Sequence, residues 1–303
     1  MTKPRVLIFL TLLFFITGCS INKVATTSLA NALASGSGSV FSSEDDIDLV
    51  CQALPLALKT MEALVDKVPD NKELDLSLAS GFILYTVASV EMGADKIKDT
   101  DLTEYSRLRL RARKLYYRAY QYGLRGLALT DKNFLKLYSQ DREKALSLIT
   151  RQEDVSLLYW TGAALAKWIT FSKNEPAAVI RLPEAVEFMR HALRINPEYD
   201  NGSLYEFFTA YESRFGSASD TAKAMEYYRQ AVRASEGKKL SVYLTYIESF
   251  AIPFQDKKAF KSNIRTILDF DLNIWPAFKL ANALTRRKAE LLLAQEDNLF
   301  LEN

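Results

Sequence analysis

The chain of 303 residues is 49% apolar, which is enough for a continuous core in one large domain or two smaller ones and excludes a disordered protein. Its 39 basic and 37 acidic side chains give a net charge of +2, a balance that disfavours nucleic acid as a partner. The 11 Gly and 8 Pro leave few breakers, so long helices are favoured over the frequent turns of a sandwich or barrel. The composition therefore predicts an all-α protein.

The first 20 residues have the layout of an export signal. Lys3 and Arg5 precede an apolar run over residues 6–17, and Gly18 and Cys19 follow it. This run is too short to cross a bilayer as a helix, because about twenty apolar residues are needed. We therefore expect a signal and not a membrane anchor.

Residues 16–19, Ile-Thr-Gly-Cys, resemble the lipobox of bacterial lipoproteins, in which the leader is cut before the cysteine and the cysteine sulfur is acylated. The resemblance implies a signal peptide over residues 1–18, lipidation at Cys19, and a periplasmic, lipid-anchored protein. Ser20, in place of an aspartate, resembles sorting to the outer membrane rather than the inner one. The alternative is an ordinary secretory leader that contains a cysteine by chance.

Residues 19–46 are expected to form a lipidated flexible tether. The Ser-Gly-Ser-Gly-Ser sequence at residues 35–39 is typical of flexible linkers, and a short helix can form within residues 24–34. Residues 47–303 are predicted to be a single helical-repeat domain.

From residue 48 onward, the spacing of apolar residues predicts helices separated by short breaks, without sustained period-two alternation. The expected helices cover residues 48–67, 71–96, 103–130, 142–150, 154–171, 182–195, 203–215, 220–234, 240–250, 256–268 and 276–294. The helix over residues 154–171 has apolar residues on all its faces, so we expect it to lie at the centre of the fold.

The expected helix over residues 103–130 has a one-sided charge pattern. From Tyr105 to Thr130 it carries seven cations and no Asp or Glu, and like charges one turn apart weaken an isolated helix. Its counter-charges must come from elsewhere. Either acidic residues of neighbouring helices or solvent neutralise the row, or part of the row faces a cavity or a partner.

Aromatic side chains accompany these cations and the next long helix. Amphipathic aromatics suit a channel or pocket with apolar walls and a few polar groups, although core rings with hydrogen-bonded hydroxyls are an equal alternative. The residues that we predict to line a pore or to bind a partner are Arg111, Arg113, Arg118, Tyr116, Tyr117, Tyr120, Tyr159 and Trp160.

The expected helices contain a degenerate internal repeat. In tetratricopeptide repeats the second helix carries a small, a large and a small residue at fixed spacing, with a proline beyond them. The fullest match is Ala185, Met189, Ala192 and Pro197. Partial matches are Ala224, Tyr228 and Ala231; Ala112, Tyr116 and Ala119; and Ala57, Met61 and Leu64 with Pro69. We predict degenerate tetratricopeptide-like helical hairpins stacked into a compact or ring-like solenoid.

The sequence offers little for catalysis. His191 is the only histidine, which excludes a metal site with several histidines and nearly excludes a histidine-based triad. We find neither a glycine-rich phosphate loop nor a nucleophile elbow. Acylation of Cys19 would leave Cys51 alone and exclude an internal disulfide. We expect no enzyme, no catalytic residue, no metal and no cofactor.

Four motifs follow one another along the chain. They are an early run over residues 48–62, a basic and aromatic run over 111–118, a Leu-Tyr-Trp helix over 154–165, and an ending over 280–289. Together they resemble the T-component lipoproteins of TRAP transporters, the TatT family. The resemblance covers nearly the whole mature chain.

This resemblance implies a homotrimeric periplasmic lipoprotein with a hole through each protomer. It would dock a periplasmic solute-binding protein whose cargo passes to a TRAP permease, without catalysis and without nucleic acid. The alternative is a tetratricopeptide-type scaffold lipoprotein for cell-envelope assembly, with a peptide-binding groove. Two places depart from the family pattern. Residues 202–205 read Gly-Ser-Leu-Tyr where Gly-Ala-Leu-His is expected, and residues 215–218 replace a turn with proline and glycines.

Overall fold

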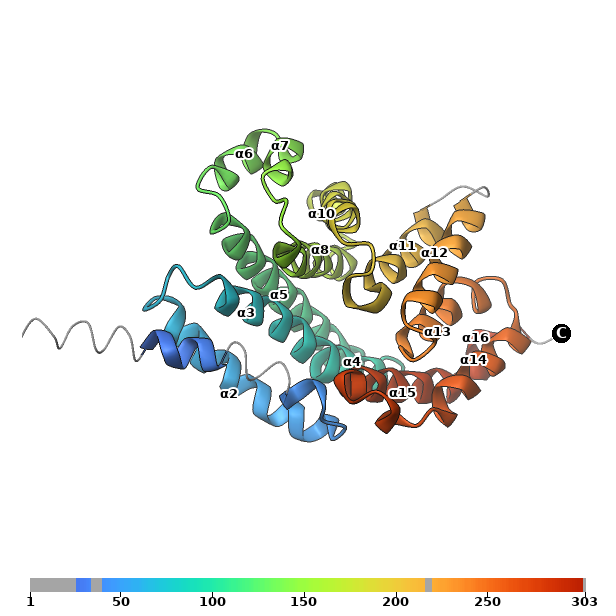
Figure 1. Cartoon of the computed structure of the whole chain (residues 1–303). Coiled ribbons are helices and arrows are strands. Elements are labelled where there is room, and N and C mark those ends of the chain that lie inside the picture. The colour runs from blue at the N-terminus through green and yellow to red at the C-terminus, as the bar shows by residue number, and fades with distance from the viewer. Residues whose placement is uncertain (1–25, 34–39, 216–219, 302–303) are drawn as a thin grey trace, which may run out of the picture.

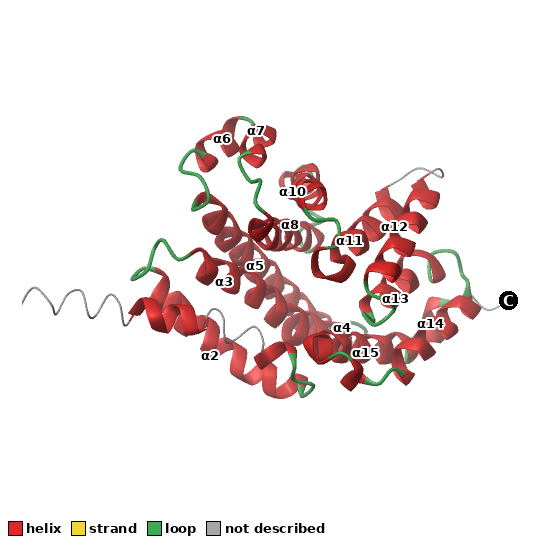
Figure 2. Cartoon of the chain, in the orientation of Figure 1, coloured by secondary structure: helices red, strands yellow, loops and turns green. Residues whose placement is uncertain are grey.

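The computed structural model describes residues 26–33, 40–215 and 220–301 (Figure 1). Within these ranges the regular structure is helical and contains no strand, as Figure 2 shows. The prediction of an all-α protein is confirmed. The predicted signal peptide, Cys19 and the Ser-Gly run at residues 35–39 lie outside the described residues, so those predictions stay predictions.

Part of the expected tether packs on the body. Residues 26–33 form a short helix, consistent with the one allowed for in this segment. Ala30 is fully buried, and the Asn71 side chain donates a hydrogen bond to the Asn31 side chain at 2.7 Å. This helix of the segment over residues 19–46 is therefore held against the body.

Side-chain caps set where the first long helices begin. α2 (Ile47–Val65) follows Asp46, whose carboxylate accepts hydrogen bonds from backbone N–H groups of the first turn. Asn71 caps α3 (Lys72–Tyr85) in the same way.

α3 continues through a π-helix, η1 (Thr86–Glu91), into α4 (Met92–Ile97). By length and composition alone, the run Lys72–Ile97 is able to cross a membrane. Half of its most apolar window is buried inside the protein, and a core helix passes the same test. Packing within the body therefore accounts for its apolar residues.

α5 (Leu102–Ala128) and α8 (Val155–Thr170) lie against each other at the centre of the molecule (Figure 1). Gly123 of α5 faces Thr161 of α8 so closely that a β-carbon on the glycine would lie 3.1 Å from Thr161 Cα. The central position predicted for the helix over residues 154–171 is thus confirmed.

The other helices extend this centre on both sides. Their bounds are α6 (Phe134–Gln140), α7 (Arg142–Ser147), η2 (Gln152–Asp154), α9 (Pro176–Val179), α10 (Leu182–Ile195), η3 (Tyr199–Gly202), α11 (Ser203–Phe215), α12 (Asp220–Ala234), α13 (Ser241–Tyr246), the π-helix η4 (Ile247–Ala251), α14 (Lys257–Asp269), η5 (Leu272–Ile274), η6 (Pro276–Phe278), α15 (Lys279–Leu293) and α16 (Glu296–Leu299). The bounds of α10, α11 and α12 equal those predicted, whereas α6, α9 and α16 fall outside the predicted helices.

Buried apolar side chains form two clusters. The larger one spans the helices up to α11 and includes three residues of α15, and the smaller one joins α13, η4, α14 and α15. The alanines at the repeat positions, Ala185, Ala192, Ala224 and Ala231, are all fully buried. The predicted helix register is therefore right at these positions, while tetratricopeptide-like stacking stays a prediction.

α15 brings the C-terminal helices back to the N-terminal ones (Figure 1). Its contacts there are ion pairs of Arg287 with Asp48 (2.9 Å), Lys288 with Asp95 (2.7 Å) and Lys279 with Asp45 (2.8 Å). Leu280, Ala283 and Leu284 of the same helix belong to the larger core cluster. The C-terminal helices thus contact the N-terminal ones through one face of α15, which meets α2 and α4. We call this face the seam, and its contacts are both apolar and ionic.

Candidate functional site

A cavity of about 700 Å³ lies between α8, α10 and α11. Most of the side chains that line it are apolar. They include Ala163, Ala166, Ile169, Val179, Leu182, Met189, Phe207 and Ala210. Such walls suit a largely apolar small molecule.

The charged groups of the lining differ in their exposure. Lys173 and Arg214 are exposed to solvent, and Lys167 is partly buried. Ser203 is buried, and the Glu206 side chain is only 13% exposed. The cavity therefore has hydrated cations on one side and a buried carboxylate on another.

Lys167 joins the cavity wall to the π-helix η1. Its ammonium lies 3.0 Å from the carboxylate of Glu91, and the Tyr116 hydroxyl donates a hydrogen bond to the same carboxylate. Burial opposes ionisation of Glu91, but the attraction of Lys167 and the hydrogen bond from Tyr116 outweigh it, so the pKa of Glu91 is lowered. Lys167 is thus already paired on the side away from the cavity.

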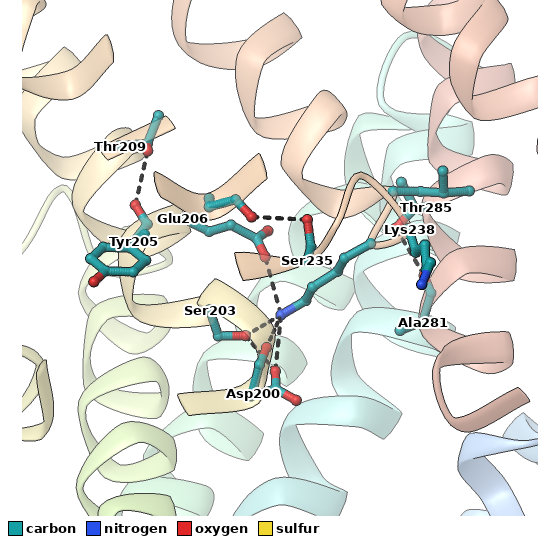
Figure 3. A network of polar contacts seen from close by, with 12 residues as sticks. Asp200, Ser203, Tyr205, Glu206, Thr209, Ser235, Lys238, Ala281 and Thr285 are labelled. Carbon is teal, nitrogen blue, oxygen red and sulfur yellow. Dashed lines mark hydrogen bonds and ion pairs between the residues drawn. The ribbon is translucent and has the colours of Figure 1, made fainter. Parts of the chain in front are cut away.

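Lys239 forms an ion pair with the buried carboxylate of Glu206. Figure 3 shows Asp200, Ser203 and Glu206 around one point, where the Lys239 ammonium lies 2.9 Å from Asp200 Oδ2 and 3.1 Å from Glu206 Oε1. Lys239 also donates to Ser203 Oγ. Burial disfavours a charged lysine, but Glu206 and Asp200 outweigh it and raise the pKa of Lys239. This side chain therefore stays an ammonium ion.

The turn that carries Asp200 has an uncommon backbone. Asp200 and Asn201 have φ angles of 47° and 52°, in the left-handed region that non-glycine residues rarely adopt. The Asp200 carbonyl accepts a hydrogen bond from Lys239 at 2.9 Å. Gly202 follows at φ 95°, and a β-carbon there would lie 3.1 Å from Ala231 Cα. Lys239 thus fixes the turn from which α11 and its cavity residues start.

The basic row of α5 is paired largely with carboxylates. Arg111 instead donates to the Tyr85 hydroxyl at 2.6 Å. The ion pairs are Arg107 with Glu104, Arg113 with Glu175, Arg118 with Glu62 (2.9 Å) and Arg125 with Asp75 (3.4 Å). Three of the seven cations thus pair with acids of other segments, as in the first of our two alternatives, and Arg107 pairs within α5 itself.

The predicted tyrosines of α5 lie mainly in the core. Tyr116 and Tyr120 are 0% and 3% exposed, and Tyr120 donates to Glu184 at 2.7 Å. Tyr117 is 38% exposed and packs on Trp168, with ring centroids 5.4 Å apart. None of the three belongs to the described lining of the cavity. Their role in a pore or a partner site stays a prediction.

Of the other predicted site residues, two lie at or next to the cavity. Tyr159 lines it, and Trp160 packs edge-on against Tyr159, with ring centroids 5.1 Å apart. Arg111, Arg113 and Arg118 are absent from the described lining, so a role for them belongs to a partner surface if it exists. The structure thus brings one of the eight candidate residues into the cavity wall.

Three residues of the site escape prediction from sequence. Ser203, Glu206 and Lys239 occur in segments without a recognisable motif, and Lys239 meets Glu206 only through the fold. One signal was present, since Ser203 lies in the Gly-Ser-Leu-Tyr sequence that departs from the family pattern. That local departure coincides with the wall of the cavity.

The fold and this site define an all-α protein with a mostly apolar cavity. In the described part of the chain, no three His, Cys, Asp or Glu side chains gather as a metal site. The model of the TRAP transporter T-component family matches residues 43–300, and the chain belongs to this family.

The chain is also similar to a protein of Treponema pallidum (strain Nichols) that is described as uncharacterized. The two are 27% identical over an alignment of 305 positions, and the alignment covers 94% of each chain. Membership of a transporter-component family, rather than an enzyme family, associates the chain with a TRAP system and with a membrane or periplasmic location.

Proposed function

We propose that the protein is a periplasmic, lipid-anchored subunit of a TRAP-type solute uptake system. It docks a solute-binding protein and holds a largely apolar solute on its way to the permease. The observation that carries the proposal is the mostly apolar cavity between α8, α10 and α11 in a member of the TRAP transporter T-component family.

The size and walls of the cavity support a role in holding a solute. Its volume of about 700 Å³ falls in the range of about 300–1,000 Å³ that is usual for small-molecule sites. Apolar walls bind chiefly by removing apolar surface from water, which requires little specific chemistry. A protein that passes its solute onward benefits from this mode, because few strong polar contacts have to be broken at release.

The anchoring and assembly in this proposal follow from the leader and from the family. Acylation of Cys19 would hold the body at a membrane, with the outer membrane favoured by Ser20. A homotrimer and a cognate solute-binding protein are the expected partners. Arg111, Arg113 and Arg118, which do not belong to the described lining of the cavity, are candidates for the docking surface.

The test combines a cavity-filling variant with a docking measurement. Ala163→Trp places a large ring in the cavity, and Ala63→Trp on the exposed side of α2 is the matched control. We expect Ala163→Trp to weaken binding of a neutral apolar fluorescent dye by about tenfold or more, and the control to leave it unchanged.

The same proteins are then titrated with the cognate periplasmic solute-binding protein. Saturable docking that is unaffected by either tryptophan supports the proposal, because the cavity and the docking surface are separate. Absence of docking together with capture of extended peptides would instead support the scaffold function. Equal dye binding by both variants would remove the cavity as the solute site.

A further inference from the structure

The charges at the buried end of the cavity do not balance. Asp200 and Glu206 are two carboxylates that face one ammonium, that of Lys239. Among the described residues, no second cation lies within ion-pair distance of either carboxylate. The Asp200 side chain is 37% exposed and keeps contact with water, whereas that of Glu206 is 13% exposed. The uncompensated negative charge therefore falls on the Glu206 side, where water is least able to stabilise it.

Glu206 also has unused bonding capacity. Its Oε1 is buried and accepts no hydrogen bond within the described structure, although the Lys239 ammonium lies 3.1 Å away as an ion pair. An ionised carboxylate has about four acceptor positions, and leaving them empty in a buried place is unfavourable. Oε1 itself has almost no accessible surface, so a donor that enters the cavity reaches this carboxylate through the exposed part of the Glu206 side chain, which lines the cavity together with Ser203.

The cations of the lining do not offer an equivalent place for an anion. Lys167 is already paired with Glu91 at 3.0 Å. Lys173 and Arg214 are exposed to solvent, where ion pairs contribute little. The buried polar group of this cavity that can still bind a partner is therefore the Glu206 carboxylate, a hydrogen-bond acceptor.

We propose that the cavity recognises a solute whose polar end donates hydrogen bonds, an amine first and a hydroxyl second, and that this end binds at Glu206. The apolar part of the solute lies along the walls formed by α8 and α10. This inference rests on the proposed function, because it names the class of solute that the same cavity takes. A solute that ends in a carboxylate is disfavoured, since it would face Glu206 and Asp200.

The first test compares head groups on one alkyl chain. Decylamine, decanol and decanoate are titrated against a neutral apolar dye bound to the full chain, which carries Cys19→Ser so that no acyl group competes. We expect decylamine to displace the dye at a concentration about tenfold or more below decanoate, with decanol between them, as expected for one charge-assisted hydrogen bond.

The second test removes the charge of Glu206. Glu206→Gln leaves Asp200 and Lys239 as a balanced pair, so the turn at Asp200 keeps its ammonium. The matched control is Glu212→Gln, on the same helix, where the buried glutamate pairs with Lys223 at 2.6 Å and does not belong to the described cavity lining. We expect Glu206→Gln to reduce the preference for decylamine over decanoate by about tenfold, and the control to leave it intact.

The outcomes separate this inference from the proposed function. Tighter binding of decanoate than of decylamine to the wild-type chain overturns the inference, while binding itself leaves the proposed function standing. An equal amine preference in wild type and folded Glu206→Gln also overturns it. If none of the three amphiphiles displaces the dye, both fail. Should Glu206→Gln not fold, the wild-type series alone decides.

Discussion

Two arginines of one helix differ in what faces them. Arg113 and its partner Glu175 are both partly exposed, with side chains 32% and 48% accessible, whereas Asp75, the partner of Arg125, is buried. Exposed ion pairs contribute little, but removing the counter-charge of a buried carboxylate is costly. The same substitution should therefore have different effects at the two sites.

We predict that Arg113→Gln changes the free energy of unfolding by less than about 1 kcal/mol, while Arg125→Gln lowers it by about 1–3 kcal/mol. Urea denaturation of the two variants at neutral pH measures both values. Arg113→Gln is also titrated with the solute-binding protein, where a loss of affinity without a loss of stability would assign Arg113 to the docking surface. Equal stabilities of the two variants would show that Arg125 does not compensate Asp75.

Asp75 itself is poorly compensated. The residue is fully buried, neither carboxylate oxygen accepts a hydrogen bond in the described structure, and the Arg125 Nε lies 3.4 Å away. Burial raises the pKa of Asp75 from 3.8 to about 7, and the attraction of Arg125 offsets only part of this. The folded protein therefore binds a proton here that the unfolded chain releases at lower pH.

A raised pKa in the folded state means that stability is fully present below the unfolded pKa and is lost as the pH rises toward about 7. We predict that wild-type stability falls relative to Asp75→Asn by up to about 1.4 kcal/mol per pH unit between about pH 4 and pH 7. Denaturation curves of both proteins across this range provide the measurement. A constant difference would mean that Asp75 does not change its charge in this window.

At the scale of elements, the contact between α5 and α8 depends on a missing side chain. A β-carbon on Gly123 would collide with the Thr161 side chain and approach its backbone, and backbone cannot move aside cheaply. Gly93 of α4 is the matched control, because a β-carbon there has space: its nearest neighbour would be Leu108 Cδ1 at 3.8 Å.

We predict that Gly123→Ala lowers the free energy of unfolding by about 1–3 kcal/mol through overpacking. Gly93→Ala should be neutral or should stabilise the protein by up to about 1 kcal/mol, because alanine favours a helix. Thermal and chemical denaturation distinguish the two. A Gly123→Ala variant as stable as wild type would show that the two helices can separate at little cost.

The sequence patterns predicted the bounds of several helices correctly, because particular residues mark where these helices begin or end. Pro183 lies in the first turn of α10, where proline is tolerated, and so marks the start of this helix. The π-helices η1 and η4 were read as plain helix, since one extra residue per turn does not change which residues are apolar. The short helices α6, α9 and α16 offer too few residues for a periodic pattern.

These sequence patterns could not predict the cavity. An apolar residue that faces a cavity, such as Ala163 or Phe207, follows the same helical spacing as one that packs in a core. Predicting aromatic residues as site candidates found Tyr159 but also selected core rings such as Tyr116. The contact of Lys239 with Glu206 needs the fold, because 33 positions of sequence separate them without a shared motif.

For the whole molecule, attachment to the membrane is expected to depend on Cys19 alone. The predicted leader is too short to span a bilayer, and half of the apolar window in Lys72–Ile97 is buried. We predict that Cys19→Ser releases the folded protein into the soluble periplasmic fraction. Cell fractionation with a high-salt wash measures this, and a variant that still sediments with membranes would contradict it.

The seam at α15 has a consequence for how the protein is made. Arg287 and its partner Asp48 are 239 positions apart, so their contact forms only after nearly the whole chain has been synthesised. Until then Asp48 and Asp95 lack their basic partners on α15. Closing so long a loop is slow compared with local helix formation. A chain that still lacks α15 therefore has an open form in which this edge of α2 and α4 is uncovered, and the docking of α15 closes it.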